Sequence, residues 1–332
     1  MKRQAIVLIG ALALVAGACG GDSESTTTTE VVPTTTTTQA EATTTTVAET
    51  TTTQGPAEVV FTGADGVEST ISDTSRIVSL GGDITEIIFE LGLGDQVVAI
   101  DVTTTYPEAA TDLPVVGFGQ QLAPEPVLAF QPTLVIGDEM TAPPEAIDQL
   151  RAAGIPVVIL PLQTTLDGVS EKIRQIAQIL SAEDAGEELV ARVEADIAAA
   201  GTVANPDLRV AYVYVRGPQL LLLFGQGIAT NAMIVGAGAV DAGAEANVFG
   251  AAPLTPEALV AAAPDVIVLP EAGLEGLGGV EGFAAVPGVA ETPAGEAGAF
   301  LAYDEAFFFN LGPRAGLALQ QFVTDLTELT GS

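Results

Sequence analysis

The sequence contains an internal repeat: LAPEPVLAFQPTLVI at residues 122–136 resembles LTPEALVAAAPDVIV at residues 254–268, 132 residues later. Each copy begins with Leu-x-Pro-Glu, continues in a helical pattern and ends in an apolar run that is typical of a buried strand. A second matching pair, RIVSL at 76–80 and RVAYV at 209–213, precedes the two copies. The repetition predicts two similar lobes, because a solenoid would need three or more repeats.

Short runs rich in Val, Ile and Leu alternate with helical patterns throughout the region after residue 58. This alternation is typical of parallel strands whose sheet is covered by helices on both faces. In the first half, the predicted strands are 76–80, 97–100, 134–136 and 157–160, and the predicted helices are one capped by Asp83 and one at 144–153. We therefore predict an α/β fold with two similar doubly wound α/β lobes.

The segment 167–200 joins the two halves. Its apolar residues recur at steps of three and four positions, as on one face of a helix. Ser181 and Asp184 have the spacing of a helix cap near its middle. We predict one long helix, bent once, as the only connection between the lobes, and such a link permits only small hinge or rocking motions.

The N-terminus has the layout of a signal peptide. Lys2 and Arg3 precede an apolar run at 5–16 that is too short to span a bilayer. Small residues then lead to Cys19, the only cysteine, in a pattern that resembles a bacterial lipoprotein box. The resemblance implies that residues 1–18 are removed and that Cys19 is lipidated; a plain secretory signal is the alternative.

A Thr-rich tract without hydrophobic periodicity fills residues 19–57. Such a composition cannot form a core and predicts a disordered tether between a membrane anchor and the folded part. The remaining chain is then divided into an N-terminal lobe at 58–166, the linking helix at 167–200 and a C-terminal lobe at 201–332.

Composition argues against several classes of function. A net charge of −33 disfavours nucleic acid, whose backbone is itself negative. The absence of histidine removes the usual Ser-His-Asp and Cys-His mechanisms, and no nucleophile lies three or four positions from Lys172, the only lysine after the signal peptide. Carboxylate pairs stay open, but none forms a motif, and we predict that the chain is not an enzyme. No phosphate-binding GxxxxGK[ST] motif is present, so ATP hydrolysis would belong to a separate subunit.

A candidate binding site lies in VAYVYVRGP at 210–218. Side chains alternate along a strand, so Tyr212, Tyr214 and Arg216 share a face, and the last two stand at the strand end where doubly wound sheets bind ligands. A tyrosinate can ligate ferric heme, a nearby cation favours the ionised phenol, and arginine can pair with a carboxylate. The alternative is that a tyrosine here packs in the core, as we expect for Tyr212.

Four further stretches, taken in their order and spacing, carry a resemblance to a known family. They are RIVSLGGDITEIIFELG from 76, DVTTTYPEA from 101, LPVVGFGQQL from 113 and GGVEGFAAVPGVAETPAG from 278. With two lobes, a linking helix, an anchor and a tether, they make the region 76–330 resemble the class III substrate-binding proteins of ABC importers, and the hemin-binding branch in particular. The resemblance implies a monomeric extracytoplasmic lipoprotein on the outer face of the cell membrane. It would carry hemin to a permease that has a separate ATPase subunit, and it would need no catalytic cofactor.

The resemblance also implies roles for the repeated glutamates. In that family one glutamate on each lobe contacts arginines of the permease, and Glu125 and Glu257 stand at the matching positions. Considered alone, each is an acid in the first turn of a helix, where a carboxylate offsets the helix dipole.

For the ligand, the resemblance places Tyr214 on the heme iron, with Arg216 beside it. Related hemin proteins have Tyr or His near Phe118, which cannot bind iron but can stack on a porphyrin. Tyr106 is a second candidate oxygen or a residue that packs its turn, and Met140 is a weaker donor. A ferric siderophore or cobalamin is the alternative iron- or metal-containing ligand, and a surface interaction module or a hydrolase is the alternative function.

Overall fold

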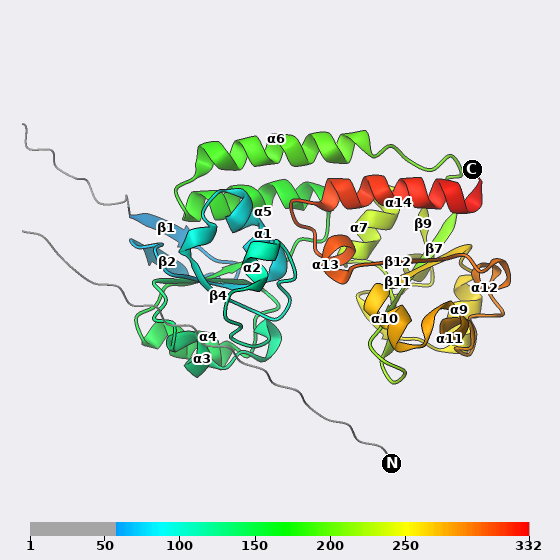
Figure 1. Ribbon diagram of the computed structural model, residues 1–332, viewed down its shortest axis with the longest axis horizontal. Helices are drawn as coiled ribbons and strands as arrows, with labels where there is room; N and C mark the ends of the chain where they lie inside the picture. The colour runs from blue at the N-terminus through cyan, green and yellow to red at the C-terminus, as the bar shows by residue number, and fades with distance from the viewer. Residues whose placement is uncertain (1–57, 332) are drawn as a thin grey trace, which may run out of the picture. The chain divides into compact units, whose positions relative to one another are not determined.

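Residues 58–331 are described by the computed structural model, and they form two α/β lobes connected by helices (Figure 1). The predicted signal peptide, Cys19 and the predicted tether lie outside the described residues, so those predictions stay untested. None of the helices between residues 58 and 331 is both long and apolar enough to cross a membrane. The α/β fold predicted from the repeated sequence is confirmed.

The N-terminal lobe is built on a four-stranded parallel sheet in the order β4-β3-β5-β6. All four strands coincide with the apolar runs of the sequence: β3 (Ile77–Leu80), β4 (Val97–Ile100), β5 (Leu134–Asp138) and β6 (Val157–Leu160). Because side chains alternate along a strand, Ile77 and Leu134 enter one core while Val78 and Val135 enter another.

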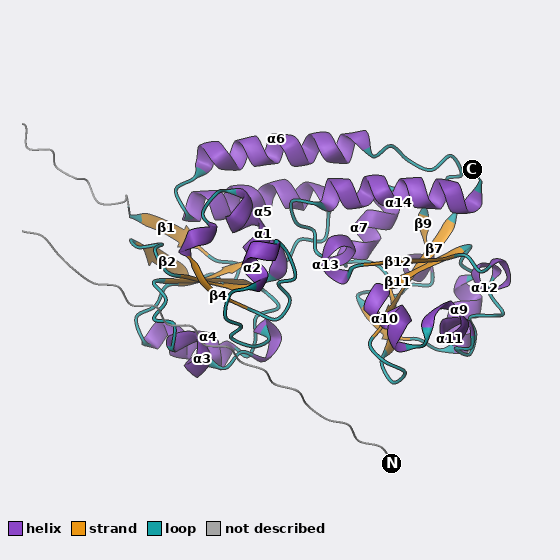
Figure 2. Ribbon diagram, viewed as in Figure 1, coloured by secondary structure: helices purple, strands orange, loops and turns teal. Residues whose placement is uncertain are grey.

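Helices cover both faces of this sheet (Figure 2). The first face is covered by α1 (Gly82–Glu90) and α5 (Leu166–Ile179), and the second by α3 (Pro124–Leu128) and α4 (Pro144–Ala152). Shorter turns complete the lobe: η1 (Gly94–Gln96), α2 (Glu108–Thr111) and η2 (Gly119–Gln121). The double covering explains why these strands are continuous apolar runs rather than alternating ones.

The hairpin of β1 (Val59–Thr62) and β2 (Glu68–Ile71) was not predicted. Each strand has only four residues, and half of them face solvent, so the hydrophobic signal is short. Ile71 is buried in the core, and the Ser69 hydroxyl donates to the Val157 carbonyl at 3.2 Å. The hairpin is thus attached to the N-terminal lobe beside β6.

The C-terminal lobe has a mixed six-stranded sheet centred on β7 (Arg209–Val215). Three strands are parallel to β7 or to its neighbour: β9 (Val240–Asp241), β11 (Val266–Pro270) and β12 (Phe300–Tyr303). Two antiparallel strands extend the other side: β8 (Leu221–Phe224) and β10 (Ala251–Pro253). The antiparallel edge is the main difference between the lobes.

Eight helices surround this second sheet in the described chain. They are α7 (Ala229–Gly236), α8 (Ala242–Glu245), α9 (Pro256–Ala262), α10 (Glu271–Gly276), α11 (Gly279–Ala284), α12 (Pro293–Ala297), α13 (Glu305–Phe309) and α14 (Ala315–Thr330).

The sequence repeat has the same structure in both lobes. In the first copy α3 leads into β5, and in the second α9 leads into β11. The strand pairing is equivalent as well, since Ile77 pairs with Leu134 and Val210 with Val266. The repeat predicted two similar lobes, and the structure adds that the equivalent strands are paired in the same way.

The predicted single helix at 167–200 is wrong, because the chain reverses in the middle of this segment. Helix α5 ends at Ile179, and α6 (Glu183–Ala199) runs back along it, with Arg174 bound to Glu187 at 2.8 Å and Ser170 to Glu194 at 2.9 Å. Ser181 does not cap α6. Instead it adopts a left-handed conformation with φ of 53°, which turns the chain.

Helix α6 also lies beside α14, the last helix of the described chain. The Gln320 side chain donates to the Asp196 carbonyl at 2.7 Å. Gly316 allows close contact, since a Cβ there would lie 2.6 Å from that of Asp196. Helices α5, α6 and α14 together form a helical layer. One continuous hydrophobic core includes residues of both lobes and of this layer.

Helix α1 begins without the cap predicted at Asp83. Its first residue is Gly82, and Asp83 lies in the first turn, where it forms a buried ion pair with Lys172 of α5. An acid in this turn also complements the helix dipole. The carboxylate that resembled a cap thus holds α5 against α1.

The two repeat helices allow a direct test of capping. The Thr255 hydroxyl accepts a hydrogen bond from the Ala258 amide at 3.1 Å, whereas Ala123 at the same position of α3 has no such group. We expect Thr255→Ala to lower the free energy of unfolding by about 1 kcal/mol in urea titrations, and Ala123→Thr to raise it by a similar or smaller amount. Unchanged midpoints for both variants would contradict this assignment.

Candidate functional site

Strand β7 ends with the predicted pair of residues at the carboxyl edge of the second sheet. Tyr212 is buried and stacks on Phe308, which confirms its prediction as a core residue. Tyr214 is half-buried, stacks on Phe224 at a centroid distance of 5.4 Å, and has the Arg216 guanidinium 5.7 Å from its ring centroid. The structure therefore brings Tyr214 and Arg216 together, as the strand alternation predicted.

A third residue, Glu305, contacts both of them. The Tyr214 phenol donates to Glu305 Oε1 at 3.4 Å, and Arg216 Nη2 lies 3.7 Å from Glu305 Oε2. Glu305 is the first residue of α13, a helix whose N-cap is Asp304. Sequence reasoning missed Glu305, because nothing local connects it with a strand 90 residues earlier.

The electrostatic environment of Tyr214 differs from the one expected. Burial raises the pKa of its phenol, the Glu305 carboxylate raises it further, and Arg216 only partly offsets these effects. We expected the nearby cation to favour the ionised phenol, but the cation is shared with an anion. Without ligand, the tyrosine is therefore protonated at neutral pH.

Arg314, which follows α13, links the two lobes. Its guanidinium binds the Glu86 carboxylate of α1 through two hydrogen bonds of 2.9 and 3.0 Å. The Glu86 side chain is only 6% exposed and that of Arg314 20%. Burial raises the pKa of Glu86, although the hydrogen bonds and the charge of Arg314 act in the opposite direction.

Tyr106 belongs to this interlobe contact. The Arg314 guanidinium lies over its ring, 3.7 Å from the centroid, and Phe307 of α13 lies on the same arginine at 5.4 Å. Tyr106 precedes a cis proline, Pro107. Its ring therefore supports an arginine, and its predicted role as a second candidate oxygen stays a prediction.

Phe118 and Met140 are the other two predicted ligand-binding residues. Phe118 is half-buried in the loop before η2, whose Gly119 amide donates to Asp101 at 3.4 Å. Met140 is exposed after β5, and its amide donates to Asp138 at 2.9 Å. Within residues 58–331, no hydrogen bond or ring contact joins either residue to Tyr214.

Acids gather at the carboxyl edge of the N-terminal sheet. Burial raises the pKa of Asp138 to about 6, Asp83 and Asp101 raise it through repulsion, and Lys172 partly offsets the effect. No group of three or more His, Cys, Asp or Glu side chains between residues 58 and 331 is placed to hold a metal ion. The edge is thus acidic without forming a cation site.

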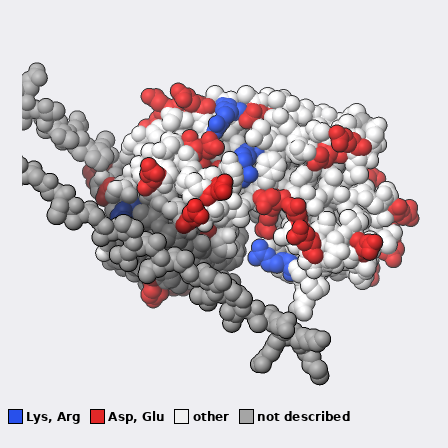
Figure 3. Space-filling view, in the orientation of Figure 1, with Lys and Arg blue, Asp and Glu red and all other residues white. Residues whose placement is uncertain are grey.

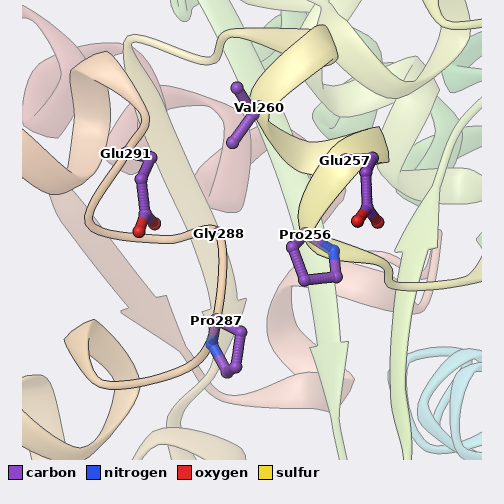
Figure 4. A pocket seen from close by; sticks show the side chains of 6 residues that line it. All are labelled: Pro256, Glu257, Val260, Pro287, Gly288 and Glu291. Atoms are coloured by element: carbon purple, nitrogen blue, oxygen red, sulfur yellow. The ribbon is translucent and has the colours of Figure 1, made fainter.

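Glu125 and Glu257 occupy equivalent positions, the second residue of α3 and of α9. Both are exposed, and neither side chain has a partner within the described chain. A surface pocket of about 360 Å³ lies beside Glu257 (Figure 4). Its lining is Pro256, Glu257, Val260, Pro287, Gly288 and Glu291, and it includes none of the predicted ligand-binding residues.

Acidic side chains are spread over both lobes on the face shown in Figure 3, and basic side chains appear there at only a few places. With 43 acids and 10 basic residues in the chain, each exposed arginine is a rare feature. Arg216, with 66% of its side chain exposed, is one of these.

Residues 77–306 match the family described as periplasmic binding protein. The chain belongs to that family. Its members are binding proteins, so the prediction that this chain is not an enzyme is confirmed, and so is the prediction that it needs no catalytic cofactor.

Several similar solved structures are those of heme-binding proteins. RhuT of Roseiflexus sp. RS-1 is 42% identical, with a TM-score of 0.74 over 77% of this chain and 99% of that one. HmuT is 34% identical, with a TM-score of 0.77 over 81% and 90%. BhuT in complex with two hemes is 35% identical, with a TM-score of 0.71 over 76% and 98%. The class III fold is thereby confirmed.

Curated relatives have different names. A vitamin B12-binding protein of Vibrio campbellii is 33% identical over 42% of this chain, and a substrate-binding lipoprotein of Bacillus subtilis, YvrC, is 30% identical over 59%. The matched regions span 50% and 63% of those two proteins. The family is thus settled, whereas the ligand is named differently among the relatives.

The Glu86–Arg314 pair gives a prediction about stability. Arg314→Ala leaves the Glu86 carboxylate buried and unpaired, so we expect a loss of about 3 kcal/mol in the free energy of unfolding. Replacing both partners, as Glu86→Leu with Arg314→Met, should recover most of that loss in the same denaturation assay. A double variant as unstable as the single one would show that the arginine acts mainly through Tyr106.

The pKa of Asp138 gives a prediction about pH. Its folded-state pKa of about 6 lies above the ordinary value of 3.8, so the charged form costs stability as pH rises through this interval. Asp138→Asn should therefore stabilise the protein above pH 6, by at most about 3 kcal/mol. The advantage should disappear below about pH 4. An advantage that is constant from pH 4 to 8, measured by urea unfolding, would contradict the assignment.

Proposed function

We propose that this chain is an extracytoplasmic substrate-binding lipoprotein that captures hemin and delivers it to the permease of an ABC importer. The observation that carries the proposal is the pair of Tyr214 and Arg216 at the carboxyl end of β7. A phenol that can ligate ferric iron stands there beside a cation that can bind a propionate.

Variants of HmuT support this assignment. That protein has also been solved with alanine in place of a tyrosine, of an arginine two positions after it, and of a histidine. Tyr214 and Arg216 have the same spacing. This chain contains no histidine, so any second side-chain ligand would have to be of another type.

In the proposed capture step, three side chains bind different parts of hemin. Ferric iron would replace the phenol proton of Tyr214, which passes to solvent, and the resulting tyrosinate would hold the iron. The raised pKa of this phenol means that iron must supply the driving force for ionisation. Phe118 would stack on the porphyrin, and Arg216 would bind a propionate.

Delivery would use the two repeated glutamates. Glu125 and Glu257 are exposed, unpartnered in the described chain and equivalent in the two lobes, as expected of paired contacts to arginines on a permease. The permease and a separate ATPase subunit would be the partners of a monomeric binding protein. Cys19 would carry the lipid anchor, and residues 19–57 the tether.

Cobalamin is the second candidate ligand, because several curated relatives are named vitamin B12-binding proteins. A ferric siderophore is a third. Siderophore binders typically use several arginines against anionic chelates, and Arg216 is the only arginine at the end of β7.

A hemin titration followed by absorbance tests the proposal. We expect saturable binding with a tyrosinate-type high-spin spectrum, and Tyr214→Phe should remove that spectrum and weaken binding by about ten-fold or more. Tyr106→Phe is the matched control and should leave the spectrum unchanged, because its ring packs on Arg314.

Cyanocobalamin and a ferric siderophore should be titrated in parallel. Saturable binding of either one without binding of hemin would overturn the hemin proposal and leave the importer function in place. Retention of the tyrosinate spectrum in Tyr214→Phe would instead move the iron ligand to another residue.

A further inference from the structure

Glu305 lies at the same edge of the sheet as the candidate ligand residues. It follows β12, which runs parallel to β11, and β11 runs parallel to β7, so the carboxyl ends of all three strands meet at one edge. Asp304 accepts a hydrogen bond from the Phe307 amide at 2.9 Å and thereby fixes the start of α13. The backbone of Glu305 is thus held in place, while its side chain is 41% exposed.

The two carboxylate oxygens of Glu305 have different partners. Oε1 accepts from the Tyr214 phenol at 3.4 Å, and Oε2 lies 3.7 Å from Arg216 Nη2. Both contacts are long, and the side chains are partly exposed, so the pairing is weak. A weak pairing at an accessible site is one that an external group can replace.

The Glu305 carboxylate lies where the carboxylate of an acidic ligand would bind. A ligand carboxylate at the end of β7 would seek the Arg216 guanidinium, which is the group that Glu305 now engages. We propose that Glu305 is an internal competitor, whose carboxylate occupies the place of a ligand carboxylate on Arg216 until the ligand displaces it. This inference rests on the proposed function, because it assumes that the porphyrin binds beside Tyr214.

Displacement is an exchange of one ion pair for another. The ligand carboxylate pairs with Arg216, and the Glu305 carboxylate turns to solvent. The net gain in binding free energy is therefore smaller than it would be at an arginine without a partner. Glu305 therefore lowers affinity for ligands that carry carboxylates and has no such effect on ligands without them. It is a positioning and specificity residue rather than an iron ligand.

Glu305→Gln isolates this role. Its amide oxygen can still accept from the Tyr214 phenol, but the charge that pairs with Arg216 is gone. Glu296→Gln is the matched control: it removes the same charge from α12, which precedes β12 and so lies at the opposite end of that strand. Comparing the two variants separates the local competition from the general effect of one fewer acid.

Three probes should be titrated into the wild-type protein and both variants: hemin, metal-free protoporphyrin IX and hemin dimethyl ester. We expect Glu305→Gln to bind the first two about two- to five-fold more tightly than wild type does, the range of an exposed ion pair. The ester lacks free carboxylates, so it should gain less affinity than hemin does; any gain that it shares with hemin comes from the Tyr214 phenol, whose pKa Glu305 raises. Glu296→Gln should bind all three probes as wild type does.

The outcomes are distinct from those of the proposed function. If wild type binds hemin and Glu305→Gln binds it with the same affinity, the competitor role is overturned and hemin capture stays in place. An equal gain for the ester, or an equal gain in Glu296→Gln, would also overturn it. Absence of porphyrin binding by wild type would overturn both proposals.

Discussion

The ion pair between Glu86 and Arg314 joins the two lobes directly. It joins residues that are 228 positions apart, and it is largely buried, so its loss would leave a charge without compensation. Arg314 also carries the ring of Tyr106 on one side and contacts Phe307 of α13. Arg314 therefore connects the loop that contains Tyr106 with α13, the helix that begins with Glu305.

The four strands of the N-terminal sheet and the candidate ligand pair could be predicted because their signals are local. Buried parallel strands are continuous apolar runs, and the repeat at 122–136 and 254–268 indicated which of them are equivalent. Tyr214 and Arg216 are two positions apart on one strand, so alternation alone placed them together. These features need no knowledge of the rest of the chain.

The remaining features depend on residues that are far apart in sequence. Glu305 meets Tyr214 across 91 positions, and nothing near Glu305 distinguishes it from the other acids of the chain. The reversal between α5 and α6 was missed for a different reason. Its left-handed residue is Ser181 rather than glycine, so the usual sign of a helix end is absent.

The pairing of α6 with α14 bears on how the lobes can move. The last turn of α6 contacts the first turns of α14, at Asp196, Gly316 and Gln320. Contacts such as Gln320 to Asp196 prevent the two helices from sliding independently. Motion of one lobe against the other must therefore deform this contact, which favours small rocking motions over free rotation.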